Sequence, residues 1–179
     1  MATWYHSIND TLREIIEQQH MFFVATAPAD PGDGWPNVSA KGRTLLRVLA
    51  PNLVGYLDYP GSGNETAKHV EETGRITLMV CRFDATAGIV RLYGRGRRVE
   101  LDDPELIAHR DSFADDFHPF VRQAFLVDVE KVQTSCGYGV PRMQYLGDRD
   151  TLDKWCERKL EPRAMVDGLP APGALVYKE

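Results

Sequence analysis

Residues 76–94, ITLMVCRFDATAGIVRLYG, contain two strand-like runs separated by only four residues, Asp84 to Ala87. Such a short connection is typical of neighbouring antiparallel strands. Further apolar runs of strand length stand at 22–27, 37–41, 53–58 and 125–132. A doubly wound parallel sheet needs a helix after nearly every strand, and this sequence offers only two or three. The sequence therefore predicts a mainly β (α+β) fold, an antiparallel barrel with helices between its strands.

Several segments have the spacing or turn chemistry of helices. In residues 8–20, apolar side chains recur on one helical face, and Ser7 or Thr11 can form a capping box at its start. By contrast, the uninterrupted apolar run 22–27 predicts a strand that is buried on both faces. Further helices are expected after the turn at 61–63, over 104–123 in two pieces broken near Pro119, and over 150–159.

The pattern changes after about residue 134, where glycine, proline and turn residues become frequent. We expect a single domain in two parts: a barrel over residues 1–134, and a C-terminal extension over residues 135–179 packed on it. The chain of 179 residues and 20.2 kDa is long enough for one hydrophobic core.

Composition excludes several classes of protein. The formal net charge of −5 and pI of about 5.6 argue against nucleic acid or an anionic membrane as the main partner. The sequence has neither a secretory leader nor an apolar run of the ~20 residues that cross a bilayer, so a cytoplasmic protein is expected. Three cysteines without a CxxC pair and five histidines without zinc spacing predict neither a disulfide framework nor a metal site.

The segment 61–68, GSGNETAK, has the residues of an anion-binding turn. Its glycines free the backbone, Ser62, Asn64 and Thr66 offer hydrogen-bonding groups, and a helix is expected to begin directly afterwards. A helix N-terminus presents free N–H groups and partial positive charge, which favour a phosphate. The same residues also suit a plain helix cap, and the Walker pattern is absent.

Two strand segments carry cations on one face. Ser39 and Lys41 share a face of the run 37–41, which suits an anionic ligand or simply the solvated side of a strand. Arginines and a tyrosine alternate in the same way over 91–97. Because seven acidic residues follow within 100–116, we expect these arginines to form ion pairs within the protein or between subunits, with a small anionic ligand as the second interpretation.

No catalytic side chains stand out. Cys136 is either a reactive thiol or a small buried residue, and the sequence contains no nucleophile elbow and no interpretable pair of carboxylates. If the protein is an enzyme, a cofactor therefore carries the chemistry.

Six motifs taken together resemble the pyridoxamine 5′-phosphate oxidase-like proteins of the FMN-binding split-barrel superfamily. They stand in order over residues 5–170: NVSAKG at 37–42, GSGNET at 61–66 with His69, GRITLM at 74–79, RLYGRGR at 91–97, SCGYGVP at 135–141 and DGLP at 167–170.

This resemblance implies a homodimer with FMN in two clefts at the subunit interface. By position, it implies that Ser39, Lys41 and Gly42 lie along the flavin. Ser62, Asn64, Thr66 and Lys68 are then expected near its phosphate.

The sequence departs from the family in two places. Glu65-Thr66 stands where the oxidases carry an Arg-Lys pair, and no histidine follows His118, so pyridoxamine phosphate is not the expected substrate. We therefore expect an FMN-dependent oxidoreductase acting on another small molecule, with Tyr93 and Tyr138 as the hydroxyl groups to test. The alternatives are a non-catalytic protein that binds flavin, deazaflavin or haem, and an interaction module without a ligand.

Overall fold

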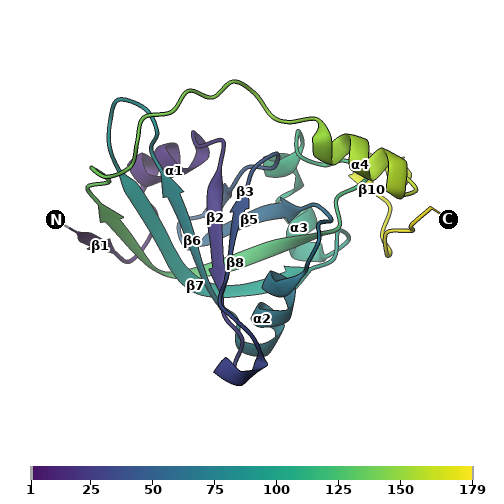
Figure 1. The fold of residues 1–179 in the computed structure, drawn as a ribbon, viewed down its shortest axis with the longest axis horizontal. Helices are drawn as coiled ribbons and strands as arrows, with labels where there is room; N and C mark the ends of the chain where they lie inside the picture. Colours follow the sequence, from purple (N-terminus) through teal and green to yellow (C-terminus); the bar gives the residue numbers. More distant parts are fainter. Residues whose placement is uncertain (1, 179) are drawn as a thin grey trace.

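An eight-stranded antiparallel sheet forms most of the protein in the computed structural model, which describes residues 2–178 (Figure 1). The strand order is β3-β2-β6-β7-β8-β5-β4, with β1 added on β8. The sheet curls without closing and ends in β3 and β4, so the predicted split barrel is confirmed. The strands are β1 (Thr3–Tyr5), β2 (Phe22–Thr26), β3 (Asn37–Lys41), β4 (Arg47–Ala50), β5 (Leu53–Asp58), β6 (Arg75–Cys81), β7 (Ile89–Val99) and β8 (Gln123–Ser135).

Strands β7 and β8 are longer than predicted because a bulge lets both bend with the barrel. Tyr93 pairs with Lys131 and Gly94 with Val129, which leaves Glu130 as the extra residue of β8. At Gly94 a Cβ atom would lie 2.1 Å from the carbonyl oxygen of Asp128, so only glycine fits at this close approach.

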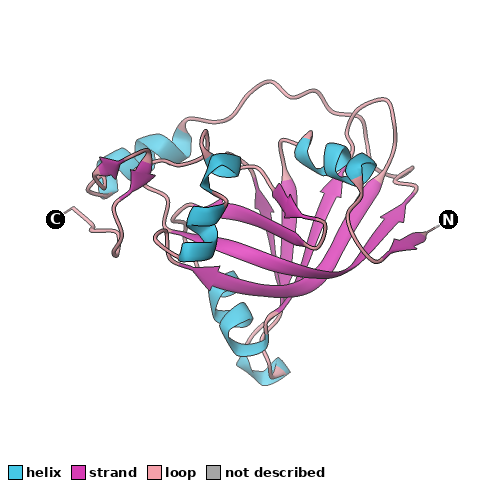
Figure 2. Cartoon of the chain, turned by 180° about the vertical axis from the view of Figure 1, so that it is seen from behind, coloured by secondary structure: helices cyan, strands magenta, loops and turns pink. Residues whose placement is uncertain are grey.

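Four α-helices and two 3-10 helices accompany the sheet (Figure 2). The helix expected over 8–20 is α1 (Asp10–Glu17), whose Leu12 and Ile16 are buried in the main core. The expected capping box is wrong: Asn9 caps this helix by accepting a hydrogen bond from the backbone N–H of Leu12 at 2.9 Å. The others are α2 (Glu65–Thr73), α3 (Pro104–Ala108), α4 (Thr151–Lys159), η1 (Pro31–Asp33) and η2 (Arg110–Phe113).

Two further expectations are wrong. Strand β2 alternates between buried and half-buried residues, because only one of its faces meets the core. The helical region 104–123 is short, since α3 and η2 end at Phe113 and β8 already begins at Gln123. The break falls at His109 rather than at Pro119.

The C-terminal residues contact the barrel through a small core of their own. Cys156 of α4 and Leu160, directly after this helix, are buried against Phe120 and Tyr59. Arg163 donates to the carbonyl oxygen of Val121 at 2.6 Å. Beyond α4, the described residues form the hairpin of β9 (Met165–Val166) and β10 (Leu169–Pro170) and a bridge between Leu160 and Tyr177. Within residues 2–178, no helix combines the length and the hydropathy needed to cross a bilayer.

Candidate functional site

A buried carboxylate joins three elements of the fold. Asp58 ends β5, and its side chain is only 2% exposed. One of its oxygens accepts from Lys41 Nζ at 2.7 Å, and the other accepts from Arg122 Nη2 at 2.7 Å and from Gln123 Nε2 at 3.0 Å. Burying a carboxylate is costly unless it is paired and hydrogen-bonded, and Asp58 is both.

The amide of Gln123 connects this pair of cations to the predicted anion-binding turn. Its Nε2 also donates to Asn64 Oδ1 at 2.9 Å, and Arg122 Nη1 donates to the carbonyl oxygen of Gly63 at 3.3 Å. Asn64 is the N-cap of α2, and its side chain does not cap the helix. The first turn of α2 therefore opens beside two cations.

A second hydrogen-bonded chain runs along the other side of this turn. Ser39 Oγ donates to Asn37 Oδ1 at 3.2 Å, and Asn37 Nδ2 donates to Thr66 Oγ1 at 3.2 Å. Behind it, buried Thr26 and His69 share a hydrogen bond of 3.0 Å between Oγ1 and Nδ1. We define the polar corner as Ser39, Lys41, Asp58, Asn64, Thr66, Arg122 and Gln123.

The polar corner brings together four of the seven predicted binding residues: Ser39, Lys41, Asn64 and Thr66. Gly42 lies next to Lys41 on the wall of a neighbouring cavity, and Ser62 is exposed in the turn before α2. Lys68 lies outside the hydrogen-bonded network, where it pairs with Glu72 at 3.8 Å and is 58% exposed. Sequence reasoning missed Asn37, Asp58, Arg122 and Gln123.

Two acidic side chains of α2 lie on the same side of the helix as Lys68. The carboxylate of Glu65 folds back over Gly63, since a Cβ atom there would lie 2.3 Å from Glu65 Oε2. Glu65 and Glu71 also line a shallow hollow of about 380 Å³ beside Lys68. A phosphate that approached this helix end would meet Glu65 unless that exposed side chain turned outward.

Burial keeps the neighbouring phenol of Tyr56 neutral. Its side chain is fully buried on β5, and desolvation, reinforced by the charge of Asp58, raises the pKa of Tyr56 well above its usual value. Its ring stacks on Phe125 with centroids 5.1 Å apart. Tyr56 is therefore a neutral phenol within the main core, on the same strand as Asp58.

On the predicted arginine face of β7, Arg95 and Arg97 form ion pairs within the chain as expected, whereas Arg91 donates to Ser135 Oγ at 3.1 Å. Arg95 pairs with Glu130, Arg97 with Glu105 and Asp128, and Arg98 with Glu71 and Glu100. Arg95 also donates to the carbonyl oxygen of Thr73 at 2.8 Å.

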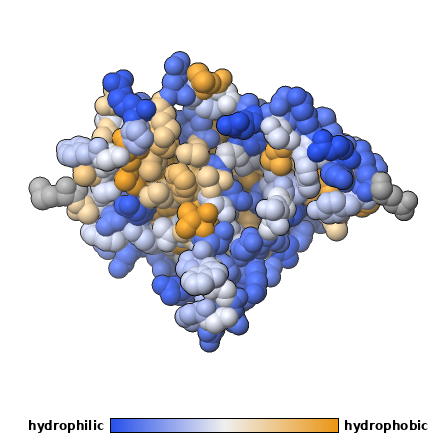
Figure 3. Space-filling view, in the orientation of Figure 1, coloured by the Kyte–Doolittle hydropathy of each residue, from blue (hydrophilic) through white to orange (hydrophobic). Residues whose placement is uncertain are grey.

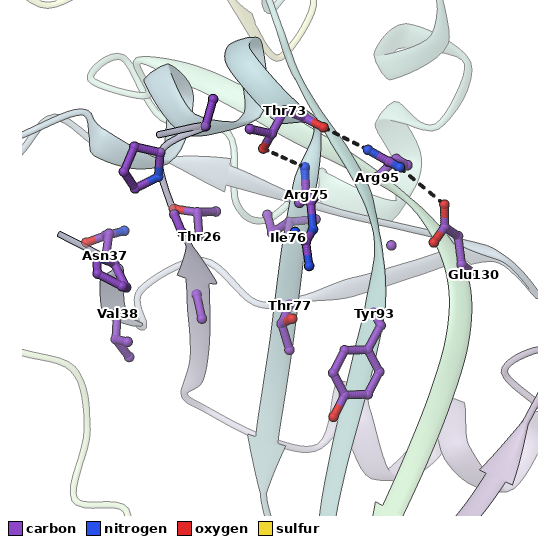
Figure 4. A pocket seen from close by; sticks show the side chains of 16 residues that line it. Thr26, Asn37, Val38, Thr73, Arg75, Ile76, Thr77, Tyr93, Arg95 and Glu130 are labelled. Carbon is purple, nitrogen blue, oxygen red and sulfur yellow. Dashed lines mark hydrogen bonds and ion pairs between the residues drawn. The ribbon is translucent and has the colours of Figure 1, made fainter. Parts of the chain in front are cut away.

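Tyr93, on the same face, lies in a separate cavity of about 480 Å³ (Figure 4). In this view Thr77 and Tyr93 project from adjacent strands, with Asn37 and Val38 on one side and Glu130 on the other. The hydroxyl of Tyr93 donates to Gln133 at 3.1 Å. Tyr138, the other tyrosine singled out from the sequence, is exposed after β8.

Cys136 is exposed, so the interpretation of it as a buried residue is wrong. A hydrogen bond from the backbone of Tyr138 is the main cause that lowers the pKa of its thiol. Residues 2–178 contain no group of three or more histidine, cysteine or acidic side chains placed to hold a metal ion.

Comparison with known proteins identifies the family. The family model described as pyridoxamine 5′-phosphate oxidase matches residues 8–136. The chain belongs to this family. A curated relative, the pyridoxamine 5′-phosphate oxidase family protein ustO of Aspergillus flavus, is 39% identical over 153 residues. That match covers 84% of this chain and 61% of the relative, so the chain spans less than two thirds of the relative's length.

Solved structures share the fold at low sequence identity. HupZ from Group A Streptococcus has a TM-score of 0.55 at 19% identity, over 70% of this chain and 91% of HupZ. An FMN-binding protein from Syntrophomonas wolfei has a TM-score of 0.51 at 14% identity, over 74% of this chain and 85% of that protein. At these identities the likeness supports the fold alone.

Proposed function

We propose that this protein binds FMN, with the phosphate at the polar corner, and uses it as an oxidoreductase. The observation that carries the proposal is the meeting of Lys41, Arg122 and the open first turn of α2 around one buried carboxylate. Family membership supports a flavin as the ligand, and the Syntrophomonas wolfei protein of the same fold is FMN-binding.

The donors present suit a phosphate. Lys41 and Arg122 are each about a quarter exposed, so both can reach a ligand while they remain bound to Asp58. The buried Nε of Arg122 has no hydrogen-bond partner among the described residues, and a phosphate oxygen would satisfy it. The free N–H groups of α2 and the hydroxyl of Thr66 complete an anion-binding set.

The net charge of the polar corner predicts a modest affinity for FMN. Two cations and Asp58 leave one net positive charge, and Glu65 would cancel it if it stayed against Gly63. Because Glu65 is exposed, its carboxylate can rotate into solvent at small cost. The residues therefore fit a phosphate once Glu65 faces outward.

The protein's own contribution would be binding and orientation. FMN, when bound, supplies hydride transfer, which no side chain of the corner offers. Lys41 and Arg122 would hold the negative end of the cofactor, and Asp58 fixes both cations in place.

We also propose a homodimer. Apolar side chains gather over the outer face of the sheet where β2, β3 and β6 lie together (Figure 3). By strand alternation, Phe23, Ala25 and Met79 face outward here, opposite the buried Val24 and Leu78. Val38 on β3 is 69% exposed beside them. An exposed apolar surface of this kind is typical of a protein interface.

The visible spectrum of the purified protein, before and after addition of FMN, tests the proposal. A flavin spectrum with one FMN per chain supports it, and light scattering should then give the mass of a dimer. A Soret band after expression would overturn FMN in favour of haem. Protein that stays colourless after incubation with FMN and gel filtration would also overturn it.

A further inference from the structure

The segment between β8 and α4 crosses the open end of the barrel and is held at a few points. Residues 136–150 form neither helix nor strand, and residues 141–150 are exposed. In Figures 1 and 2 this segment arches over the sheet from the end of β8 to α4. These ten exposed residues add nothing to the hydrophobic core, so the contacts that hold the segment against the barrel indicate its role.

Three contacts fix the course of the segment. Gly137 lies against Gly88 with φ of +64°, and a Cβ atom there would be 2.7 Å from the backbone nitrogen of Gly88. The backbone N–H of Met143 donates to the carbonyl oxygen of Phe83 at 3.0 Å. The ring of Tyr145 stacks on that of His20, with centroids 3.7 Å apart and planes 6° from parallel.

A cavity of about 760 Å³ lies between this segment and the barrel. Residues 143–149 form one wall, and the opposite wall comes from the ends of α1, β3 and β6. Lys41 and Gly42 belong to that opposite wall, so the cavity adjoins the polar corner. Its volume lies in the range of sites that enclose small organic ligands.

The lining selects a class of ligand. Met21, Phe83 and Met143 provide an apolar and polarisable surface, and the stacked rings of Tyr145 and His20 provide a flat one. These groups favour a planar aromatic molecule over an aliphatic or sugar-like one.

The charges of the lining balance, since Lys41 and Arg149 line the cavity together with Asp84 and Asp148. Lys41 is already bound to Asp58 at 2.7 Å. Asp84 is already bound by Arg82 at 3.0 Å and by the backbone N–H of Thr86 at 2.7 Å. Among residues 2–178, neither Arg149 nor Asp148 has an ion-pair partner, so Arg149 is the cation of the lining that is left to bind an acid group of a ligand.

We propose that residues 143–149 and the end of β3 enclose a binding site for a planar aromatic anion, a carboxylate, sulfonate or phosphate, that stacks against Tyr145 with its acid group toward Arg149. The role of this molecule as the substrate rests on the proposed flavin function; the site itself does not. Residues 137–150 lie outside the region that the family model matches, residues 8–136.

Fluorescence titration with anilinonaphthalene sulfonate, an anion that carries a planar naphthalene ring, tests the site directly. The unchanged protein should bind one probe per chain with enhanced emission. Replacing Tyr145 by Ala removes the stacking surface and should raise the Kd of the probe about threefold to tenfold. Arg149→Gln should raise it about threefold.

Tyr138→Ala is the matched control, since Tyr138 is an exposed tyrosine of the same segment that does not line the cavity. Its Kd should stay that of the unchanged protein, and both tyrosine variants should keep the same thermal midpoint. Equal affinity of the Tyr145→Ala variant and the unchanged protein would overturn the proposal. Competitive displacement of the probe by FMN would also overturn it, because the probe would then occupy the flavin site.

FMN titration separates this proposal from the proposed function. The Tyr145→Ala variant should bind FMN as the unchanged protein does while it loses affinity for the probe. If the unchanged protein bound the probe in the manner described but took up no FMN, the flavin function would fail and the site would stand.

Discussion

Lys41 and Arg122 bind opposite oxygens of one buried carboxylate, Asp58, each at 2.7 Å. Lys41 ends the edge strand β3, and Arg122 immediately precedes β8, so Asp58 joins two distant parts of the sheet. Arg122 also donates its backbone N–H to the carbonyl oxygen of Asp58 at 2.8 Å. This arrangement makes Asp58 a structural support for the cations that we assign to the flavin phosphate.

Replacing Asp58 by Asn should destabilise the protein by about 2–4 kcal/mol, because Lys41 and Arg122 would lose their shared counter-charge. Both cations are partly exposed, which keeps the effect below that of a fully buried triad. Urea unfolding followed by circular dichroism measures it. Asp84→Asn, which removes an exposed carboxylate paired with Arg82, should have a much smaller effect on the free energy of unfolding. Equal effects of the two substitutions would contradict the role of Asp58.

Lys41→Met should weaken FMN binding by about tenfold to a hundredfold, the loss expected for one charge-assisted hydrogen bond to a phosphate. Lys68 is the matched control for Lys41, because it pairs with Glu72 outside the polar corner. Lys68→Met should therefore change the Kd by no more than about twofold. Isothermal titration calorimetry of both variants decides between them, and a larger loss from Lys68→Met would move the phosphate to the outer face of α2.

Local sequence patterns predicted the fold and part of the candidate site. Strands β3 and β5 have the predicted bounds, since each is a short run between clear turn signals. The turn into α2 was found because glycine and cap residues act within a few positions of each other. Lys41 and Thr66 were found because they stand in such local motifs.

The site residues that sequence patterns did not predict are brought together by the register of the strands, which local spacing does not reveal. Asp58 pairs with Gln123 across β5 and β8, and that pairing places Arg122 beside the same carboxylate. The one local signal was an acidic residue at the end of the apolar run LVGYLD, because a buried charge needs partners. The break at His109 was missed since Pro119 is the stronger local signal, although it lies beyond the last helical turn.

Glu65→Gln should tighten FMN binding by about twofold to fivefold, because it removes a negative charge beside the incoming phosphate. This gain in affinity for FMN should shrink as the salt concentration rises, because Glu65 is exposed and salt screens its charge. Calorimetric Kd values at low and high ionic strength measure both effects. Glu71→Gln, six residues further along α2 and paired with Arg98, is the control and should give a smaller change. Weaker binding by the Glu65→Gln variant would mean that Glu65 contacts the ligand favourably.

Gly94→Ala should destabilise the protein by at least about 3 kcal/mol, because the added methyl group would meet the carbonyl oxygen of Asp128 at the bulge. Since Asp128 is held in the ladder of β7 and β8, the strands would have to separate. Gly61→Ala, where a Cβ atom meets nothing within 4 Å, should have little effect. Urea midpoints of the two variants test this. A Gly94→Ala protein as stable as the Gly61→Ala protein would show that the bulge is not rigid.

Because of His118, the free energy of unfolding should be smaller in mild acid than at neutral pH. Burial, and after it the charge of Arg43, lowers the pKa of His118 below 6.5, with Asp153 and Glu157 acting in the opposite direction. The unfolded chain therefore binds a proton more readily, so the free energy of unfolding falls as the pH drops through 6.5 and levels off below the folded pKa. One proton limits the slope to ~1.4 kcal/mol per pH unit. His118→Asn and His118→Phe both remove the titrating group, and both should flatten the curve of unfolding free energy against pH whatever each does to packing. A slope that persists in both variants would assign the acid sensitivity to another group.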